Sequence, residues 1–274
     1  MKKLLAMCAA LICLVFVGCG GAPGGNGPAG NGAASKSLKV GATAVPHAEI
    51  LEVVKPILEK DGIKLDIVEF SDYVQPNLAL NDKELDANFF QHEQYLKNFV
   101  EEHKEVKLKS AAGIHIEPMG IYSRKITDLK DLPDGAAVAI PNDPTNGGRA
   151  LQLIAKAGLI TLKDGAGDNA TVQDIVGNPK NIKFNEVEAA QVPRTLEDVT
   201  AAVINTNYAM QVDLSPMKDA LFMEDSTSPY VNIIAVREGD ESRPEIQALV
   251  KATKSDEVKK FIEDKYKGAV VPAF

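Results

Sequence analysis

The chain has no tryptophan, and only 5% of its 274 residues are aromatic. Basic residues are also in the minority, because 30 Lys and Arg stand against 38 Asp and Glu, which gives a formal net charge of −8. Nucleic acids are bound through basic faces that meet the phosphates and through aromatic rings that stack on unpaired bases. The sequence offers neither feature, so we expect no nucleic-acid partner.

Cysteine is equally scarce, and its three positions are Cys8, Cys13 and Cys19. No cysteine follows position 19, so the remainder of the chain can form no disulfide and supplies no thiol nucleophile. The sequence also lacks a G-x-S-x-G elbow, an H-E-x-x-H motif, a phosphate-binding P-loop and a G-x-G-x-x-G turn. We therefore expect no catalysis and no cofactor.

The four histidines do not have the spacing of metal ligands and predict no metal site. His103 lies among charges on a predicted helix, where a solvated side chain is the simplest interpretation. We assign His47 to helix capping, since it follows Pro46 at a predicted helix start, and His115 to the interior of a strand.

The first residues, MKKLLAMCAALICLVFVGC, have the composition of a secretory signal peptide. Lys2 and Lys3 precede an apolar run, residues 4–17, that is shorter than the ~20 residues of a membrane-spanning helix. A permanent anchor helix is the less favoured alternative. The exit Phe16-Val17-Gly18-Cys19 resembles a bacterial lipobox, so we predict a signal peptide over residues 1–19 and lipidation of Cys19.

The stretch after Cys19 is rich in Gly, Ala, Pro and Asn, which cannot build a core. We predict a flexible tether over residues 20–36, with which a lipid on Cys19 would hold the folded part near a membrane.

Predicted strands and helices alternate through the next segment, which indicates an open α/β sheet with helices on its faces. The strands are expected at 38–44, 63–70 and 86–91, and the helices at 46–62 and 92–106.

Two long β-prone stretches, 109–123 and 228–237, bracket a central block of about a hundred residues, which is a plausible domain size. We interpret them as crossings between two α/β lobes. Lobe I would then comprise residues 37–120 and 228–274, and lobe II residues 121–227. A cleft between two lobes is a favoured position for a ligand.

The stretch IPNDPTNGGRALQLI, residues 140–154, predicts the start of a helix that binds an anion. With Thr145 or Asn146 as the cap, the N–H groups of Gly147, Gly148 and Arg149 would be free to attract a negative group. The guanidinium of Arg149 suits a carboxylate. An ordinary capped helix, with this arginine paired to a surface acid, is an equally open alternative.

Further candidates are polar or aromatic residues that follow predicted strands. His92 and Tyr73 lie just past strand ends, although a core strand feeding a helix and a simple loop closure are the plainer interpretations. Asn205 and Asn232 lie in β-prone segments where Asn is disfavoured, so a turn or a ligand contact must explain them. Asn207 is a weaker candidate of the same kind.

Six stretches, taken together and in order, resemble the NlpA family, the methionine-binding lipoproteins of bacterial ABC importers. They are VPHAEIL, FSDYVQPNLAL, DANFFQH, IPNDPTNGGRAL, VINTNYA and SPYVNIIAVRE, and the resemblance runs from about Leu38 to the C-terminus. It implies a type II periplasmic-binding-protein fold, in which two α/β lobes on a double-crossing hinge close on a free amino acid. It also implies delivery to a membrane permease that a cytoplasmic ATPase drives.

The resemblance also implies the roles of seven residues. Arg149 with Asn146 would hold the α-carboxylate of the ligand, and Asn205 and Asn232 match positions that hydrogen-bond its amino and carboxylate groups. Tyr73, Phe90 and His92 would surround the apolar side chain, while the neighbouring Phe89 should point the opposite way into the core.

The predicted function is therefore that of a lipid-anchored, extracytoplasmic monomer that captures L-methionine for an ABC importer. The D-isomer, another apolar amino acid or a methionine dipeptide remain alternatives for the ligand. A surface adhesion lipoprotein without a transported ligand and a lipid-anchored hydrolase are the competing classes.

Overall fold

The computed structural model describes residues 36–274, which belong to one compact unit. The predicted signal peptide, its lipidation site Cys19 and the tether as far as residue 35 lie outside the described residues. Among the helices of residues 36–274, none combines the length and the apolar character that a membrane crossing requires.

The first sheet has six strands in the order β13-β4-β12-β3-β1-β2. Its strands are β1 (Lys36–Thr43), β2 (Ile63–Phe70), β3 (Ala87–His92), β4 (Leu108–Ile116), β12 (Val231–Arg237) and β13 (Val271–Pro272). Strand β1 pairs in parallel with β2 and β3, whereas β12 runs antiparallel between β3 and β4. A late segment of the chain thus completes a sheet that an early segment begins.

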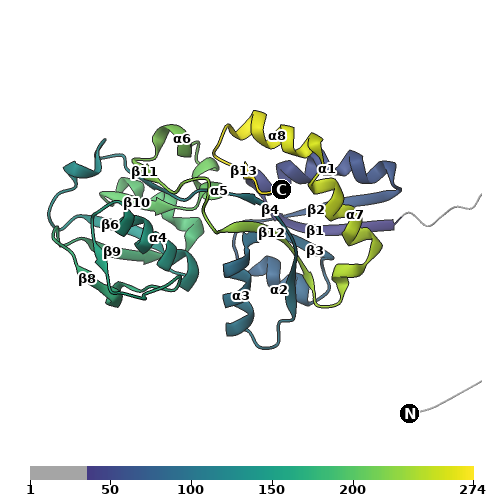
Figure 1. Ribbon diagram of the computed structural model, residues 1–274, viewed down its shortest axis with the longest axis horizontal. Coiled ribbons are helices and arrows are strands. Elements are labelled where there is room, and N and C mark those ends of the chain that lie inside the picture. Colours follow the sequence, from purple (N-terminus) through teal and green to yellow (C-terminus); the bar gives the residue numbers. More distant parts are fainter. Residues whose placement is uncertain (1–35) are drawn as a thin grey trace, which may run out of the picture. The chain divides into compact units, whose positions relative to one another are not determined.

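Helices cover both faces of this sheet (Figure 1). One face carries α1 (Glu49–Lys60), α7 (Pro244–Thr253) and α8 (Asp256–Tyr266), whose apolar residues share one core cluster with the strands. The other face carries α2 (Gln75–Asn81) and α3 (Glu93–Glu102) over a second cluster. Phe89 packs in the first cluster and Phe90 in the second, so the two rings point to opposite faces of β3 as predicted.

The second sheet has five strands in the order β11-β5-β10-β6-β9. Its strands are β5 (Gly120–Tyr122), β6 (Ala137–Pro141), β9 (Lys183–Val187), β10 (Ala201–Ile204) and β11 (Phe222–Met223). Helix α4 (Pro144–Lys156) packs on one face, and η4 (Ala189–Glu197) with α5 (Thr206–Met210) packs on the other. This lobe has its own core, separate from that of the first sheet.

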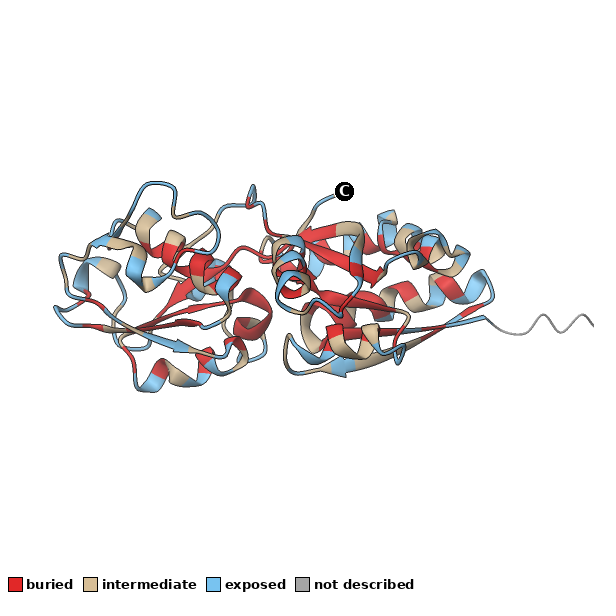
Figure 2. Cartoon of the chain, turned by 90° about the horizontal axis from the view of Figure 1, so that it is seen from below, coloured by how far each residue is buried: buried red, intermediate tan, exposed pale blue. Residues whose placement is uncertain are grey.

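Shorter elements complete the described chain. They are η1 (Ala44–Ala48), η2 (Leu129–Asp131), β7 (Thr161–Leu162), η3 (Val172–Asp174), β8 (Ile175–Gly177), α6 (Pro216–Asp219) and η5 (Asp240–Ser242). In both lobes the buried residues gather along the strands and the inner helix faces, and the outer helix faces are exposed (Figure 2).

The chain crosses between the two sheets twice. Residues 117–119 connect β4 to β5, and residues 224–230 connect β11 to β12. The first crossing interrupts a β-prone stretch at Pro118, which has no N–H to donate to a strand ladder. The two α/β lobes and the double crossing predicted from the sequence are therefore present.

Candidate ligand-binding site

A cavity lies where the strand ends of both lobes meet the two crossings. All seven residues that the sequence predicts as ligand contacts line it: Tyr73, Phe90, His92, Asn146, Arg149, Asn205 and Asn232. The lining also contains five residues that were not among the seven: Gln91, Tyr95, Glu117, Thr206 and Asn207. The fold brings these segments together from distant parts of the sequence.

Aromatic rings of the first lobe form one wall of the cavity. Tyr73 follows β2, Phe90 lies in β3 and Tyr95 lies in α3. The ring centroid of Tyr73 is 5.8 Å from that of Phe90 and 5.7 Å from that of Tyr95. Such a wall offers ring faces and edges to an apolar or thioether side chain.

His92 caps α3 and presents a polar edge to the cavity. Its Nδ1 accepts the backbone N–H of Tyr95 at 3.1 Å, which places the proton on Nε2. This Nε2 lies 3.3 Å from Oδ1 of Asn146 in the other lobe. Burial lowers the pKa of His92 to about 3, so the ring is neutral. The side chain thus acts as a hydrogen-bond donor, in addition to its place beside the aromatic wall.

The predicted cap of α4 is wrong. The N-cap is Asp143, followed by Pro144 as the first helical residue, rather than Thr145 or Asn146. The Asp143 carboxylate accepts the backbone N–H of Asn146 at 2.9 Å, and the N–H of Gly147 donates to the Asp143 carbonyl at 2.8 Å. A protein carboxylate therefore already occupies the helix N-terminus, and the sequence Asp-Pro was the overlooked capping signal.

The two glycines of α4 have a packing role instead. A Cβ added to Gly148 would lie 2.1 Å from the carbonyl oxygen of Asp168, and one added to Gly147 would lie 2.9 Å from that of Pro141. Both distances are too short for a carbon–oxygen contact. Glycine at these positions lets neighbouring backbone approach the helix closely.

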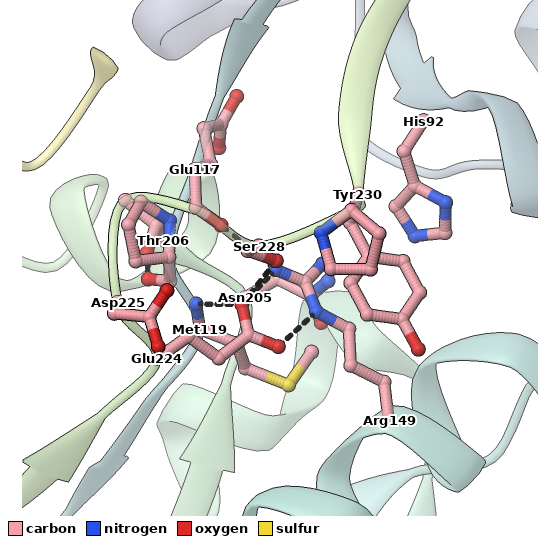
Figure 3. A network of polar contacts seen from close by, with 12 residues as sticks. His92, Glu117, Met119, Arg149, Asn205, Thr206, Glu224, Asp225, Ser228 and Tyr230 are labelled. Carbon is pink, nitrogen blue, oxygen red and sulfur yellow. Dashed lines mark hydrogen bonds and ion pairs between the residues drawn. The ribbon is translucent and has the colours of Figure 1, made fainter. Parts of the chain in front are cut away.

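Arg149 is buried and paired with an acid that the sequence did not identify (Figure 3). Its Nε donates to Oε1 of Glu224 at 2.8 Å, and its Nη2 donates to Oε2 of Glu224 at 2.5 Å. Burial alone would lower the pKa of Arg149, but Glu224 outweighs it and the pKa is raised. The alternative in which Arg149 pairs with an acid is thus observed, although the acid is the largely buried Glu224 and not a surface residue.

One end of the guanidinium remains available. Nη2 also donates to the carbonyl oxygen of Glu117 at 2.9 Å, and the guanidinium carbon lies 4.2 Å from the ring centroid of Tyr230. Nη1 makes no hydrogen bond to any side chain or carbonyl within residues 36–274. These N–H groups can therefore donate to an anion without displacing Glu224.

Asn205 and Asn207 both line the cavity, whereas the sequence analysis favoured Asn205 over Asn207. Asn205 donates to Oδ1 of Asn146 at 2.8 Å, and its own Oδ1 is buried without a partner among the described residues. Asn207 accepts the hydroxyl of Tyr73 at 2.6 Å, and its Nδ2 is likewise buried without a partner in residues 36–274. Unpaired buried polar atoms are rare and costly, so both atoms are available to bond a polar group that enters the cavity.

A buried polar cluster lies behind Asn232 and was missed by the sequence analysis. His47 Nε2 lies 3.2 Å from Oδ1 of Asn232 and 3.2 Å from Oε1 of Glu117. His115 Nε2 lies 2.7 Å from the same Glu117 oxygen. His47 therefore does not cap a helix. His115 lies in the interior of a strand as predicted, and it also contacts the carboxylate of Glu117. The pattern His-Ile-Glu at 115–117 was the available signal, because alternate residues of a strand share a face.

Three hydrogen bonds join the lobes around the cavity. Two are the contacts of Tyr73 with Asn207 and of His92 with Asn146. In the third, the hydroxyl of Tyr208 donates to the carbonyl oxygen of Ser71 at 3.2 Å. The lobes are thus closed on the cavity.

The two α/β lobes are joined by two crossings and have a polar and aromatic cavity between them. These features define a substrate-binding protein of the type II periplasmic fold. The family resemblance is confirmed as well. The chain belongs to the NlpA lipoprotein family, whose sequence profile matches residues 38–274.

Individual relatives are similar over nearly their whole length. The methionine-binding lipoprotein MetQ of Bacillus subtilis is 44% identical, with 99% of each chain covered. The D-methionine-binding lipoprotein MetQ of Escherichia coli K12 is also 44% identical, over 85% of this chain and 87% of that protein. A solved structure of a nutrient-binding protein from Burkholderia cenocepacia, bound to methionine, has 51% identity and a TM-score of 0.84 over 86% of this chain and 100% of its own.

Proposed function

We propose that this chain is a lipid-anchored binding protein that captures methionine outside the cytoplasm and delivers it to the permease of an ABC importer. One observation carries this proposal: the cavity between the lobes joins an aromatic wall in one lobe to unpaired polar atoms in the other. The names of the relatives and the methionine-bound structure support the same ligand.

The two walls match the two ends of an amino acid. The ligand side chain would lie against Tyr73, Phe90 and Tyr95, where a thioether gains ~0.3–1.5 kcal/mol per aromatic contact. The α-carboxylate would accept from Nη1 of Arg149, with Asn205 and Asn232 completing the polar contacts. Asn146 would act by holding Asn205 in place, since its own amide is already bonded to Asp143 and Asn205.

Capture requires the lobes to close around the ligand. A ligand that contacts both lobes binds the closed state more tightly than the open one, and this difference sets the shift in population. The contacts of Tyr73 and His92 across the cleft would strengthen the same state. The permease would then recognise the closed protein, and its cytoplasmic ATPase would drive transport.

In this role the protein makes and breaks no bond, so it is a carrier and not an enzyme. The anchor, the tether and the two lobes have the following roles in this proposal. Cys19 would hold the lipid, residues 20–36 would form the tether, and lobe I (37–120 and 228–274) and lobe II (121–227) would close as a monomer. The protein would then lie on the outer side of a membrane.

Isothermal titration tests the proposal. The chain without residues 1–19 is unfolded and refolded to remove carried ligand, then titrated with L-methionine, D-methionine, glycyl-L-methionine and L-leucine. We expect saturable 1:1 binding, tightest for a methionine isomer. If only leucine or only the dipeptide binds, that compound replaces methionine as the proposed ligand. If none of the four compounds binds, the result favours a surface adhesion lipoprotein.

A further inference from the structure

The N-terminal caps of two helices from opposite lobes are linked across the cleft by one side chain. His92 of the first lobe caps α3, and Asp143 of the second lobe caps α4. The side chain of Asn146, in the first turn of α4, contacts both caps. Asp143 is not among the residues that line the cavity, and the proposed ligand contacts do not use it. Its carboxylate is nevertheless one end of a hydrogen-bonded chain that joins the lobes.

Asp143 fixes the orientation of the Asn146 amide. Nδ2 of Asn146 donates to the carboxylate of Asp143, at 3.0 Å from Oδ1 and 3.1 Å from Oδ2. The backbone N–H of Asn146 donates to the same Oδ1 at 2.9 Å. An ionised carboxylate only accepts hydrogen bonds, so the amide nitrogen must face Asp143 and the amide oxygen must face the cleft. In the opposite orientation, two oxygens would meet without a proton between them.

The amide oxygen of Asn146 joins the two lobes. It accepts from Nδ2 of Asn205 in its own lobe at 2.8 Å, and Nε2 of His92 in the other lobe lies 3.3 Å away. Nδ1 of His92 accepts the backbone N–H of Tyr95, so the ring proton is on Nε2, where it can be donated to Asn146. An amide oxygen has two lone pairs, and these two donors use both. The two ends of the chain, Tyr95 and Asp143, therefore determine every donor and acceptor between them.

The short sequence DPTN, residues 143–146, supplies this arrangement. In a capping box the third residue of the helix is Glu or Gln, and its side chain reaches back to accept the backbone N–H of the cap residue. Asn146 holds this third position of α4, but it donates to the side chain of the cap. Its oxygen is thus left for His92 and Asn205. Both of these contacts go beyond what the capping of α4 requires.

We propose that Asp143 is a positioning residue for lobe closure, because it orients Asn146 so that one amide oxygen holds both His92 and Asn205. The proposal goes beyond the identity of the ligand, since the chain joins the lobes whichever small molecule binds. Without the Asp143 carboxylate the Asn146 amide can rotate. A rotated amide presents N–H groups to the donors of His92 and Asn205, so the lobes lose a hydrogen bond that joins them.

The variant Asp143→Ser separates positioning from capping. Serine is as good an N-cap as aspartate, so α4 keeps its start, but Nδ2 of Asn146 loses the carboxylate. We expect methionine to dissociate about fivefold faster in stopped-flow measurements, because one hydrogen bond between the lobes is lost, while the association rate stays close to that of the parent. Asp128→Ser, at the exposed cap of η2, is the matched control and should change neither rate. An unchanged dissociation rate in Asp143→Ser would overturn the proposal.

The background Asn146→Leu tests whether Asp143 acts through Asn146. Leucine is close to asparagine in shape but has no polar side-chain atom, so it removes the chain and leaves Asp143 as the cap. In this background Asp143→Ser should not accelerate dissociation further, because residues that act through one network are not additive. An equal acceleration in both backgrounds would show that the carboxylate acts on α4 alone and would overturn the positioning role. Circular dichroism and urea unfolding check that each variant is folded.

A measurement on the unmodified protein needs neither a folded variant nor the right ligand. The nitrogen-15 chemical shifts of the His92 ring at neutral pH show which nitrogen carries the proton. We expect the proton on Nε2, where it can be donated to Asn146. A proton on Nδ1 would overturn the proposal, because Nε2 could then not donate across the cleft. If methionine does not bind, the kinetic comparison uses the tightest ligand of the titration series, so a wrong ligand and a wrong role for Asp143 give different results.

Discussion

The guanidinium of Arg149 donates two hydrogen bonds, of 2.8 and 2.5 Å, to the carboxylate of Glu224, although the two residues are 75 positions apart in the chain. Glu224 begins the second crossing, and the same arginine donates to the carbonyl oxygen of Glu117 in the first. Arg149 therefore links α4 to both crossings by hydrogen bonds. The same residue also lines the cavity. The contacts with Glu224 and Glu117 therefore fix the position of its guanidinium.

This pairing predicts a large stability loss for Glu224→Gln. The side chains are only 4% and 13% exposed, and removing one partner of a buried ion pair costs about 3–5 kcal/mol because the other charge is left unpaired. Urea unfolding without ligand measures the change. The exposed pair of Lys156 with Asp225 provides the control, and Asp225→Asn should have a far smaller effect. Equal effects of the two substitutions would contradict the prediction.

The hydroxyl of Tyr73 predicts a contribution to lobe closure. It donates to Asn207 at 2.6 Å across the cleft, so Tyr73→Phe removes a hydrogen bond that joins the two lobes. A net loss of about 1 kcal/mol should weaken ligand binding about fivefold, measured by calorimetry. Tyr122→Phe is the matched control, because that buried hydroxyl has no partner in the described residues. An effect of equal size in the control would count against the closure contact.

The aromatic wall predicts a preference for sulfur over methylene. L-Norleucine has nearly the shape of methionine without the sulfur, and it should bind more weakly by about 0.3–1.5 kcal/mol for each lost sulfur–aromatic contact. Phe90→Leu should reduce this difference between the ligands. Phe99→Leu, in the same core cluster but away from the cavity lining, should leave the difference unchanged. A difference that Phe90→Leu does not alter would show that this ring does not contact the sulfur.

Three buried histidines predict a loss of stability on acidification. The pKa is about 4 for His47 and about 3 for His92 and His115, against about 6.5 in an unfolded chain. Between these values the unfolded state binds more protons, so the free energy of unfolding falls as pH drops from 6.5 towards 3.

Each such histidine contributes a slope of up to about 1.4 kcal/mol per pH unit within that window. The buried carboxyls of Glu117 and Asp143, whose pKa values burial raises, act in the opposite direction. We compare the parent with His92→Gln by urea unfolding between pH 6 and 5, because both proteins contain the other titrating groups and the difference isolates His92. The pH dependence of the free energy of unfolding should be smaller in the variant by the contribution of about one proton. An unchanged pH dependence would contradict the account.

Local sequence patterns predicted much of the fold, because helix and strand periodicity are local properties. The strand at 63–70 has the predicted bounds, and the helix before it ends near Gly62, where a φ of 72° favours glycine. The double crossing was also predictable, since two long β-prone stretches marked it. The seven lining residues followed from the family resemblance, and their ligand roles stay predictions.

The remaining features depend on contacts between distant segments. Nothing near Arg149 in the sequence indicates Glu224, and nothing near His47 indicates Glu117, which lies 70 residues later and meets it only through the sheet order. The error at α4 had a local cause, because the glycines were assigned to an anion when they allow Asp168 and Pro141 to approach the helix. Glycine permits close contact with ligand or with backbone, and only the three-dimensional structure separates the two.

The central claim is that the cavity between the lobes binds methionine with its side chain on the aromatic wall. Anomalous diffraction from crystals grown with L-selenomethionine as the ligand tests this claim directly, because selenium marks the position of the sulfur. We predict one strong selenium peak beside Tyr73, Phe90 and Tyr95, with the ligand carboxylate towards Arg149. A peak outside this cavity, or crystals without one at saturating ligand, would contradict the account.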